Sequence, residues 1–270
     1  MEILNFLIPF IILLTVVVFI HEYGHYYFAK KYGVGVTDFS IGFGKEIFGF
    51  NDKSGTRWKF CAVPLGGYVK FFGDRNVFSQ AEHDALLKKY NKKDQQKLFV
   101  TKPLYQRSLI VFAGPLANFL LAIIIFTFIY MFAGKDFTPA QIKEVQIDSP
   151  AQSAGIKSGD LIISINEKKV TSILEVSTFI NTASTENILI KVLRNDNYID
   201  FVVTPKLIKS EDSLGNAINK KIIGIQISPL NNELKRERLG PATAIFYAVK
   251  ETWFVTQASF DFVISLFKGK

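Results

Sequence analysis

Two long apolar runs separated by polar stretches dominate the hydropathy pattern of the chain. The first covers residues 3–20, with only three interruptions, and the second covers residues 108–133. A helix of 18 residues is about 27 Å long, close to the thickness of a bilayer core. The pattern predicts transmembrane helices at residues 1–31 and 108–134. Neither a basic leader nor a small-residue cleavage site flanks the first run, so we do not expect a cleaved signal peptide.

Shorter patterns predict strands and helices in the polar stretches. Residues 40–44 and 58–72 are broken by Gly and Pro, which indicates a curved hairpin or small sheet. Residues 188–193 and 198–203 alternate as strands do, and residues 174–182 have helical spacing. Apolar residues after Pro241 also recur at helical spacing, but charges interrupt them, which predicts an amphipathic helix on the outer membrane surface.

These patterns predict a polytopic α-helical membrane protein with two spans, a small β hairpin or sheet on the cytoplasmic side and an inserted α+β domain. The predicted parts are a first span (1–31), a cytoplasmic-side loop (32–107), a second span (108–134), the inserted domain (135–230), and a hinge with the amphipathic helix (231–270).

Composition agrees with a membrane protein that carries a globular part. Hydrophobic residues make up 49% of the 270 residues and the mean hydropathy is +0.20, a combination too apolar for one ordinary soluble domain. The single Cys61 excludes an internal disulfide. No nucleotide-binding motif is present, so we expect no nucleotide partner and no ATP-driven mechanism.

Positive charge is concentrated between the two spans. Residues 27–107 carry fifteen Lys or Arg against seven Asp or Glu, whereas residues 135–238 carry fourteen against thirteen. By the positive-inside rule, the loop between the spans faces the cytoplasm. Nucleic-acid binding is a weaker interpretation, because acidic residues are scattered among the lysines and the loop is tied to a membrane. We therefore expect a lipid bilayer, and no nucleic acid, as a partner.

The strongest chemical signal is His21-Glu22-Tyr23-Gly24-His25 at the inner end of the first span. On a helix, His21 and His25 share one face and can bind a single Zn²⁺ ion, while Glu22 lies beside the water that attacks the peptide. Zinc lowers the pKa of such a water and polarises a carbonyl, and Glu22 acts as general base and then acid. Ionisable residues at membrane depth are costly, which also favours a functional site over histidines that only pack.

Two further features fit a protease that acts on a membrane segment. A helical substrate must be unwound, and an exposed strand at Gly66, Gly67, Tyr68 and Val69 could hold the extended backbone by strand addition. A plain structural hairpin is an equally good interpretation. Asn118 in the second span is expected to face protein or water, where it could bind substrate backbone or bridge two helices.

Three motifs together resemble the site-2 protease family of intramembrane zinc metalloproteases. They are the H-E-Y-G-H segment, the P-L-G-G-Y-V-K segment at residues 64–70, and F-A-G-P-L-A-N-F at residues 112–119. Residues 144–166 and 223–227 resemble segments of a PDZ domain, as in the regulator-of-sigma-E (RseP) type. The resemblance implies zinc ligands at His21 and His25, catalytic Glu22, a substrate-receiving β-loop at Gly66–Val69, and substrate contact by Asn118.

The resemblance also implies a biological setting. We expect a multi-pass protein of the bacterial inner membrane, with the zinc site towards the cytoplasm and the PDZ domain outside. Its substrates would be single-span membrane proteins, such as an anti-sigma factor already cut outside or a remnant signal peptide. The PDZ domain would bind a peptide or chain end, or would only exclude bulky substrates.

One departure from the family concerns the third zinc ligand. Site-2 proteases take it from a Leu-Asp-Gly motif, and Asp-Gly does not occur in this sequence. We expect the sequence to be part of a longer protein with that Asp beyond Lys270, since Glu251 and Asp261 would lie on the other side of the membrane. The alternative is a membrane-anchored PDZ peptide-binding module with an incomplete, inactive zinc site.

Overall fold

The structure, a computed structural model, describes residues 2–73, 87, 89–183, 185–211 and 217–267. They form two compact units, an N-terminal unit (residues 1–122) and a C-terminal unit (residues 123–270). Helix α4 (Leu104–Phe132) belongs to both.

Two helices in the described part of the chain are long and apolar enough to cross a membrane. They are Asn5–Lys31 within α1 (Glu2–Lys31), and α4. Lysines form the last turn of α1, where cations interact favourably with the carboxyl end of a helix. The predicted pair of apolar helices is therefore present.

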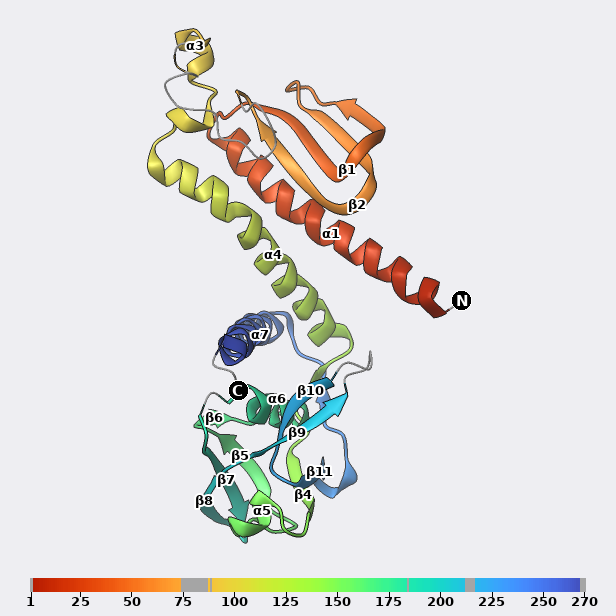
Figure 1. Cartoon of the computed structure of the whole chain (residues 1–270), viewed down its shortest axis with the longest axis vertical. Coiled ribbons are helices and arrows are strands. Elements are labelled where there is room, and N and C mark those ends of the chain that lie inside the picture. The colour runs from red at the N-terminus through yellow and green to blue at the C-terminus, as the bar shows by residue number, and fades with distance from the viewer. Residues whose placement is uncertain (1, 74–86, 88, 184, 212–216, 268–270) are drawn as a thin grey trace. The chain divides into compact units, whose positions relative to one another are not determined.

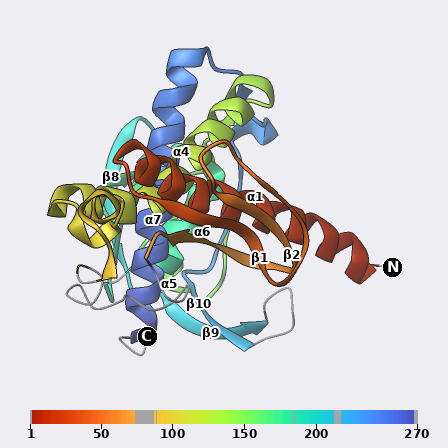
Figure 2. The same cartoon turned by 90° about the horizontal axis from the view of Figure 1, so that it is seen from above.

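A curled sheet lies along α1 in the N-terminal unit (Figures 1 and 2). It is built from the long antiparallel strands β1 (Val36–Asn51) and β2 (Arg57–Phe71). Phe39 of β1 pairs with Val69 on one side and with Trp58 on the other, so β2 curls around β1. This confirms the predicted small sheet. The short helices α3 (Lys92–Gln95) and η1 (Phe99–Thr101) lead from the sheet to α4.

Aromatic side chains hold the sheet to α1. Phe39 is fully buried, stacks on Trp58 with 4.2 Å between the ring centroids, and meets Phe19 and Tyr26 of α1 edge-on. Edge-to-face and offset-stacked pairs add to the free energy gained by burying their surface. The sheet is thereby fixed against the helix that carries the H-E-x-x-H motif.

The C-terminal unit is built around a six-stranded sheet, called here the sheet domain (residues 138–229). Its strand order is β11-β4-β5-β7-β8, with β6 paired to β5. The strands are β4 (Ala140–Val145), β5 (Leu161–Ile165), β6 (Lys168–Lys169), β7 (Ile188–Arg194), β8 (Asn197–Val203) and β11 (Ile225–Pro229). Two small antiparallel pairs accompany it, β9 (Lys206–Glu211) with β10 (Ala217–Ile222), and β3 (Lys135–Asp136) with β12 (Arg236–Glu237).

Helices cover the sheet domain and close its core. Helix α5 (Pro150–Ser153) begins at the Ser149 cap, and α6 (Ile173–Thr182) begins at a capping box formed by Ser172 and Glu175. Alternate residues of β7 are fully buried beneath α6, as their strand pattern predicts.

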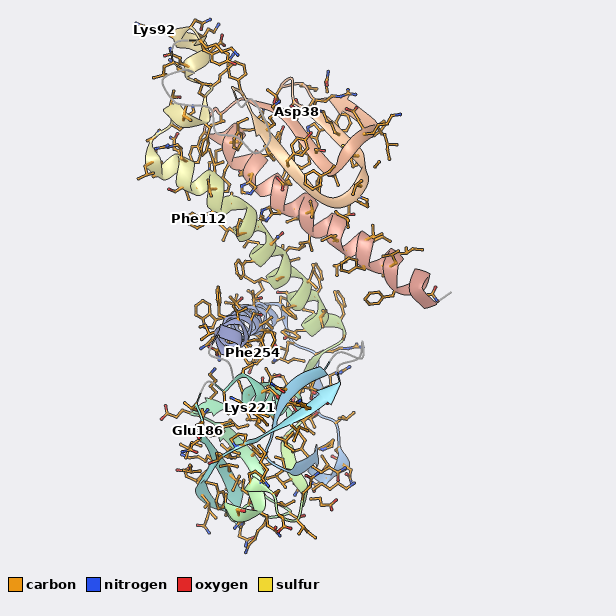
Figure 3. All side chains as sticks on the ribbon, in the orientation of Figure 1. Asp38, Lys92, Phe112, Glu186, Lys221 and Phe254 are labelled. Carbon is orange, nitrogen blue, oxygen red and sulfur yellow. The ribbon has the colours of Figure 1, made fainter. Side chains whose placement is uncertain are left out.

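Helix α7 (Pro241–Phe267) follows the turn η2 (Leu230–Asn232) and packs against α6. Phe254 of α7 meets Phe179 of α6 edge-on at 5.4 Å, and it is labelled in Figure 3. The opposite face of α7 exposes large apolar side chains, among them Phe246, Trp253 and Phe260. A helix is thus present where an amphipathic one was predicted, with one face packed on protein, and its place on the outer membrane surface stays a prediction.

Candidate active site

The two histidines of the motif face α4 where it crosses α1. His25 Nδ1 lies 2.7 Å from the carbonyl oxygen of Ile110, and His21 Nδ1 lies 3.3 Å from Asn118 Nδ2. Ile110, Gly114 and Asn118 are spaced four residues apart, so they form one face of α4. Phe112 lies on the other side of α4, away from α1, and is exposed (Figure 3). The face of α4 thus presents a carbonyl, a gap and an amide to the histidine pair.

The spacing of the histidine nitrogens fits a metal ion. His21 Nε2 and His25 Nε2 are 3.2 Å apart. Two nitrogens held at about 2.0–2.1 Å from a tetrahedral Zn²⁺ are about 3.3 Å apart, so the observed pair matches two zinc ligands. The Ile110 carbonyl accepts the hydrogen of His25 Nδ1, which leaves the lone pair of His25 Nε2 directed at the site.

The gap on α4 exists because residue 114 is a glycine. A Cβ atom there would lie 2.3 Å from His25 Nε2 and 2.8 Å from His21 Nε2. On α1, Gly24 leaves room for the backbone of α4, since a Cβ at that position would lie 2.3 Å from the Ala113 carbonyl oxygen. Glycine at both positions therefore lets the helices approach closely enough to enclose the histidine pair.

Glu22 faces the sheet. A Cβ on Gly67 of β2 would lie 3.0 Å from Glu22 Cγ and 2.9 Å from Val18 Cγ1. Glu22 is half-buried and lies one residue after His21 on α1. The candidate general base is therefore placed between the histidine pair and the strand that contains Gly67.

The stretch Gly66–Val69 forms part of one edge of the sheet. Gly67, Tyr68 and Val69 pair with Ile41, Ser40 and Phe39 of β1. Among the described residues, this end of β2 has no strand partner on its other side. An open edge of this kind offers backbone N–H and C=O groups to an extended peptide.

Asp52 in the turn between β1 and β2 ties the sheet to α1. One of its carboxylate oxygens accepts hydrogen bonds from Tyr26 Oη at 2.7 Å and Trp58 Nε1 at 3.3 Å. The other accepts from the backbone N–H groups of Ser54 and Thr56. Burial alone would raise the pKa of Asp52, but these hydrogen bonds outweigh it and hold the pKa well below its usual value.

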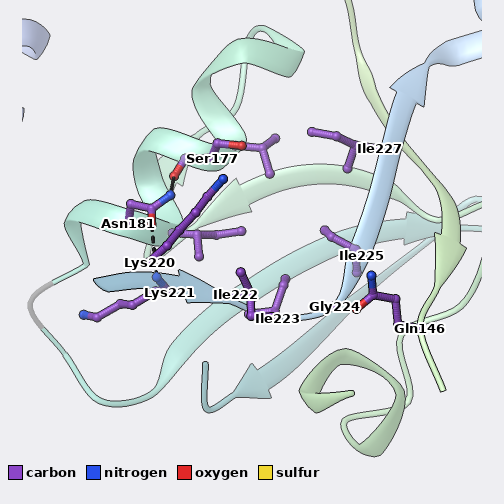
Figure 4. Close-up of a pocket in the computed structure, with 12 residues that line it drawn as sticks. Gln146, Ser177, Asn181, Lys220, Lys221, Ile222, Ile223, Gly224, Ile225 and Ile227 are labelled. Carbon is purple, nitrogen blue, oxygen red and sulfur yellow. Dashed lines mark hydrogen bonds between the residues drawn. The ribbon is translucent and has the colours of Figure 1, made fainter. Parts of the chain in front are cut away.

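A cavity lies in the sheet domain, between α6 and the strand β11 (Figure 4). Its volume is about 170 Å³, and its walls combine apolar side chains, such as Ile180 and Ile225, with polar ones, such as Ser177 and Asn181. Asn181 of α6 accepts a hydrogen bond from the backbone N–H of Lys221 at 3.1 Å, which fixes one end of the cavity (Figure 4). Among the described residues, β11 pairs with β4 alone, and Ile225 and Ile227 of β11 line this cavity, which is called the groove from here on.

The structure brings most of the predicted site residues together in the N-terminal unit. His21, His25 and Asn118 are in direct contact, and Glu22 lies against Gly67. Within the described parts of the chain, no third His, Cys, Asp or Glu joins the histidine pair in a cluster that could hold a metal.

Sequence reasoning missed the steric role of Gly114 and Gly24. The available signals were Gly-Pro inside an apolar helix and the glycine between the two histidines. The hydrogen bond from His25 to the Ile110 carbonyl was also missed, because a backbone acceptor leaves no mark in the residue types.

Known proteins match almost the whole chain. Residues 9–270 match the family model of peptidase family M50. A Mesorhizobium japonicum protein provisionally named a zinc metalloprotease is 40% identical over 263 residues, which are 96% of this chain and 71% of that protein. The metalloprotease MmpA of Caulobacter vibrioides is 32% identical over 254 residues, which are 92% of this chain and 63% of that protein.

Among solved structures, the PDZ domain of an SdrC-like protein from Listeria monocytogenes covers 34% of this chain and 88% of its own, at 21% identity. Its TM-score of 0.27 is too low to add to the description of the fold. The family match over residues 9–270 is decisive, and the chain belongs to peptidase family M50, the site-2 proteases.

Proposed function

We propose that this chain carries the zinc-binding and substrate-receiving parts of an intramembrane metalloprotease that cuts the transmembrane segment of single-span membrane proteins. The observation that carries the proposal is the pair of histidine Nε2 atoms 3.2 Å apart, with Glu22 beside them on a helix apolar enough to span a membrane. The family and the names of the relatives support a zinc metalloprotease.

Metal binding and proton transfer in peptide hydrolysis are assigned to different residues of the chain. His21 and His25 would hold Zn²⁺, which when bound supplies a Lewis acid for the scissile carbonyl and for water. Glu22 accepts a proton from the attacking water and passes it to the amine of the leaving product. Glu22 is half-buried and lies beside Gly67 of β2.

The substrate would bind as an added strand along Gly66, Gly67, Tyr68 and Val69. Gly67 brings this edge to within van der Waals contact of Glu22, so a peptide paired to the edge would pass the general base. Gly67 is also close to the carbonyl of Ser40, which explains why no side chain fits there. The substrate contact predicted for Asn118 stays a prediction.

The cellular setting follows from charge and family. We infer that the protein lies in the bacterial inner membrane as a multi-pass protein, with the zinc site towards the cytoplasm and the sheet domain outside. The excess of Lys and Arg in residues 27–107 supports this orientation. An anti-sigma factor already cut outside, or a remnant signal peptide, would be a suitable substrate.

Cleavage of a model single-span substrate in membranes tests the proposal. We would compare wild type with Glu22→Gln, each as the 270-residue chain and as the complete reading frame that contains it. Cleavage by the wild type, and loss of at least 100-fold with Glu22→Gln, is the expected result. Cleavage only by the complete reading frame would indicate that the third ligand lies outside these 270 residues. Equal cleavage by the Glu22→Gln variant would refute the assigned mechanism.

A second function, peptide binding by the sheet domain, is favoured by the groove between α6 and β11. Its open strand edge and apolar side chains suit an extended peptide or chain end, as in a PDZ domain. If no form of the protein cleaves substrate while the groove still binds peptides, a membrane-anchored binding module with an incomplete zinc site is the better description.

A further inference from the structure

Both ends of the Asn118 side-chain amide are turned into the protein. Nδ2 lies 3.3 Å from His21 Nδ1. Oδ1 is buried and has no hydrogen-bond partner among the residues that the structure describes. A buried amide oxygen without a partner is costly, so it calls for an explanation.

The hydrogen-bond roles of the two histidines differ. His25 donates from Nδ1 to the Ile110 carbonyl, so its Nε2 lone pair is available to a metal. If Asn118 Nδ2 donates to His21 Nδ1, then Nδ1 is the acceptor and the ring hydrogen of His21 is on Nε2. That hydrogen points at His25 Nε2. In that arrangement His21 cannot give its Nε2 lone pair to a metal.

A half-turn of the Asn118 amide removes the conflict. It would place Oδ1 beside His21 Nδ1 as an acceptor, and His21 would then carry its hydrogen on Nδ1 and leave Nε2 free. The two ends of an amide have nearly the same shape, so the turn needs no repacking. One amide atom lacks a partner in either orientation. Metal binding through His21 Nε2 requires the ring hydrogen to be on Nδ1. This requirement selects the amide orientation in which Asn118 Oδ1 faces His21 Nδ1.

We propose that Asn118 is the positioning residue of His21, accepting its Nδ1 hydrogen through Oδ1 whenever Nε2 binds Zn²⁺. This inference rests on the proposed zinc site. It makes α4 the support of both histidines, through the backbone carbonyl of Ile110 on one side of Gly114 and the amide oxygen of Asn118 on the other. Partners of this kind fix the orientation of a ligating imidazole and raise its basicity.

Zinc binding by the whole chain in detergent, measured by equilibrium dialysis, separates the two roles of the amide. Asn118→Leu keeps the approximate volume but has no acceptor, and it should weaken binding about 10- to 100-fold. Asn118→Asp offers only acceptor oxygens and should bind at least as tightly as wild type. Loss of binding in both variants, or in neither, would overturn the proposal.

The wild-type chain provides a test that does not depend on the folding of a variant. Nitrogen-15 NMR of the histidine rings reports which nitrogen carries the hydrogen. With zinc bound, His21 should carry it on Nδ1, and a His21 with its hydrogen on Nε2 would contradict the proposal.

His21→Ala serves as the reference for the zinc site itself. If wild type and His21→Ala bind zinc equally, both the proposed site and the role of Asn118 fail. If only His21→Ala loses zinc and Asn118→Leu does not, the role of Asn118 alone fails.

Discussion

At the scale of single residues, the candidate site depends on an absent side chain. Gly114 leaves the space that the Nε2 atoms of His21 and His25 face, and a methyl group there would lie 2.8 Å from His21 Nε2 and 2.3 Å from His25 Nε2. These distances are shorter than van der Waals contact, and the neighbouring atoms belong to rings held by further hydrogen bonds. The site therefore has little freedom to adapt.

Substitution of Gly114 tests this steric requirement. We expect Gly114→Ala to weaken zinc binding and substrate cleavage by at least 100-fold, because the methyl group would crowd the Nε2 atoms of both histidines. Gly240→Ala is a matched control, since a Cβ there meets nothing within 4 Å. Equilibrium dialysis with zinc gives the first measurement. Undiminished zinc binding by Gly114→Ala would show that the metal lies elsewhere.

Asp52 makes the stability of the N-terminal unit dependent on pH. Its folded-state pKa is depressed below the unfolded value of about 4, since hydrogen bonds to the carboxylate outweigh burial. Its stabilisation is therefore fully present above about pH 4 and is lost as the pH falls below that value towards the folded pKa.

Asp52→Asn should reveal this dependence. At pH 7 we expect the variant to be less stable by about 1–2 kcal/mol, a value reduced for partial solvent exposure. Thermal unfolding followed from pH 7 to pH 3 should show the difference between wild type and variant shrinking below about pH 4. A difference that stays constant down to pH 3 would assign the effect to packing of the side chain instead.

At the scale of elements, the hydropathy pattern predicts well which helices and strands form. The apolar runs predict α1 and α4, and the Gly- and Pro-broken strand pattern predicts the curled sheet of β1 and β2. The capping residues Ser172 and Glu175 mark the start of α6. Local sequence decides these features, because hydrophobic periodicity and turn chemistry act over a few residues.

The contacts between elements could not be predicted in the same way. The polarity of Asn118 predicts that its side chain faces protein or water. It does not predict the partner His21, which is 97 residues away along the chain. Likewise, the curl that pairs Phe39 with both Trp58 and Val69 depends on the three-dimensional path of β2. Motif residues could thus be identified from sequence, whereas the residues that hold them could not.

The docking of α7 depends on an ion pair with little exposure to solvent. Lys135 Nζ lies 2.7 Å from Glu251 Oε2 and also over the rings of Tyr130 and Tyr247. The Lys135 side chain is 9% exposed, so removal of Glu251 would leave a nearly buried charge without its counterion. The contact therefore anchors α7 to the residues that follow α4.

Glu251→Ala should loosen α7. We expect a destabilisation of about 3 kcal/mol, seen as faster hydrogen exchange along α7. Asp261→Ala removes a more exposed partner, 3.7 Å from Lys168, and should cost less than about 1 kcal/mol. Similar exchange in the two variants would mean that the apolar face around Phe254, and not the ion pair, holds the helix.

At the scale of the whole molecule, the two candidate sites belong to different units. The proposed zinc site, with His21, Glu22, His25 and the positioning residue Asn118, lies in residues 1–122, and the groove beside β11 lies in residues 123–270. All residues assigned to each site lie within one unit. Among the described residues, no third zinc ligand joins the histidine pair. Binding of a peptide to the groove and binding of zinc should therefore be separable by mutation.

Ser177→Trp provides the separating variant. Ser177 is exposed on α6 and lines the groove, so an indole there would fill part of the groove without disturbing the core (Figure 4). A fluorescent peptide with an apolar carboxyl-terminal residue should bind wild type and Ser177→Ala alike. It should bind Ser177→Trp at least tenfold more weakly, a loss of about 1.4 kcal/mol. Zinc binding should be equal in all three, because His25 and His21 are held by Ile110 and Asn118, which belong to the N-terminal unit. Unchanged peptide binding by Ser177→Trp would exclude this groove as the peptide site, and weaker zinc binding would reveal a coupling between the units.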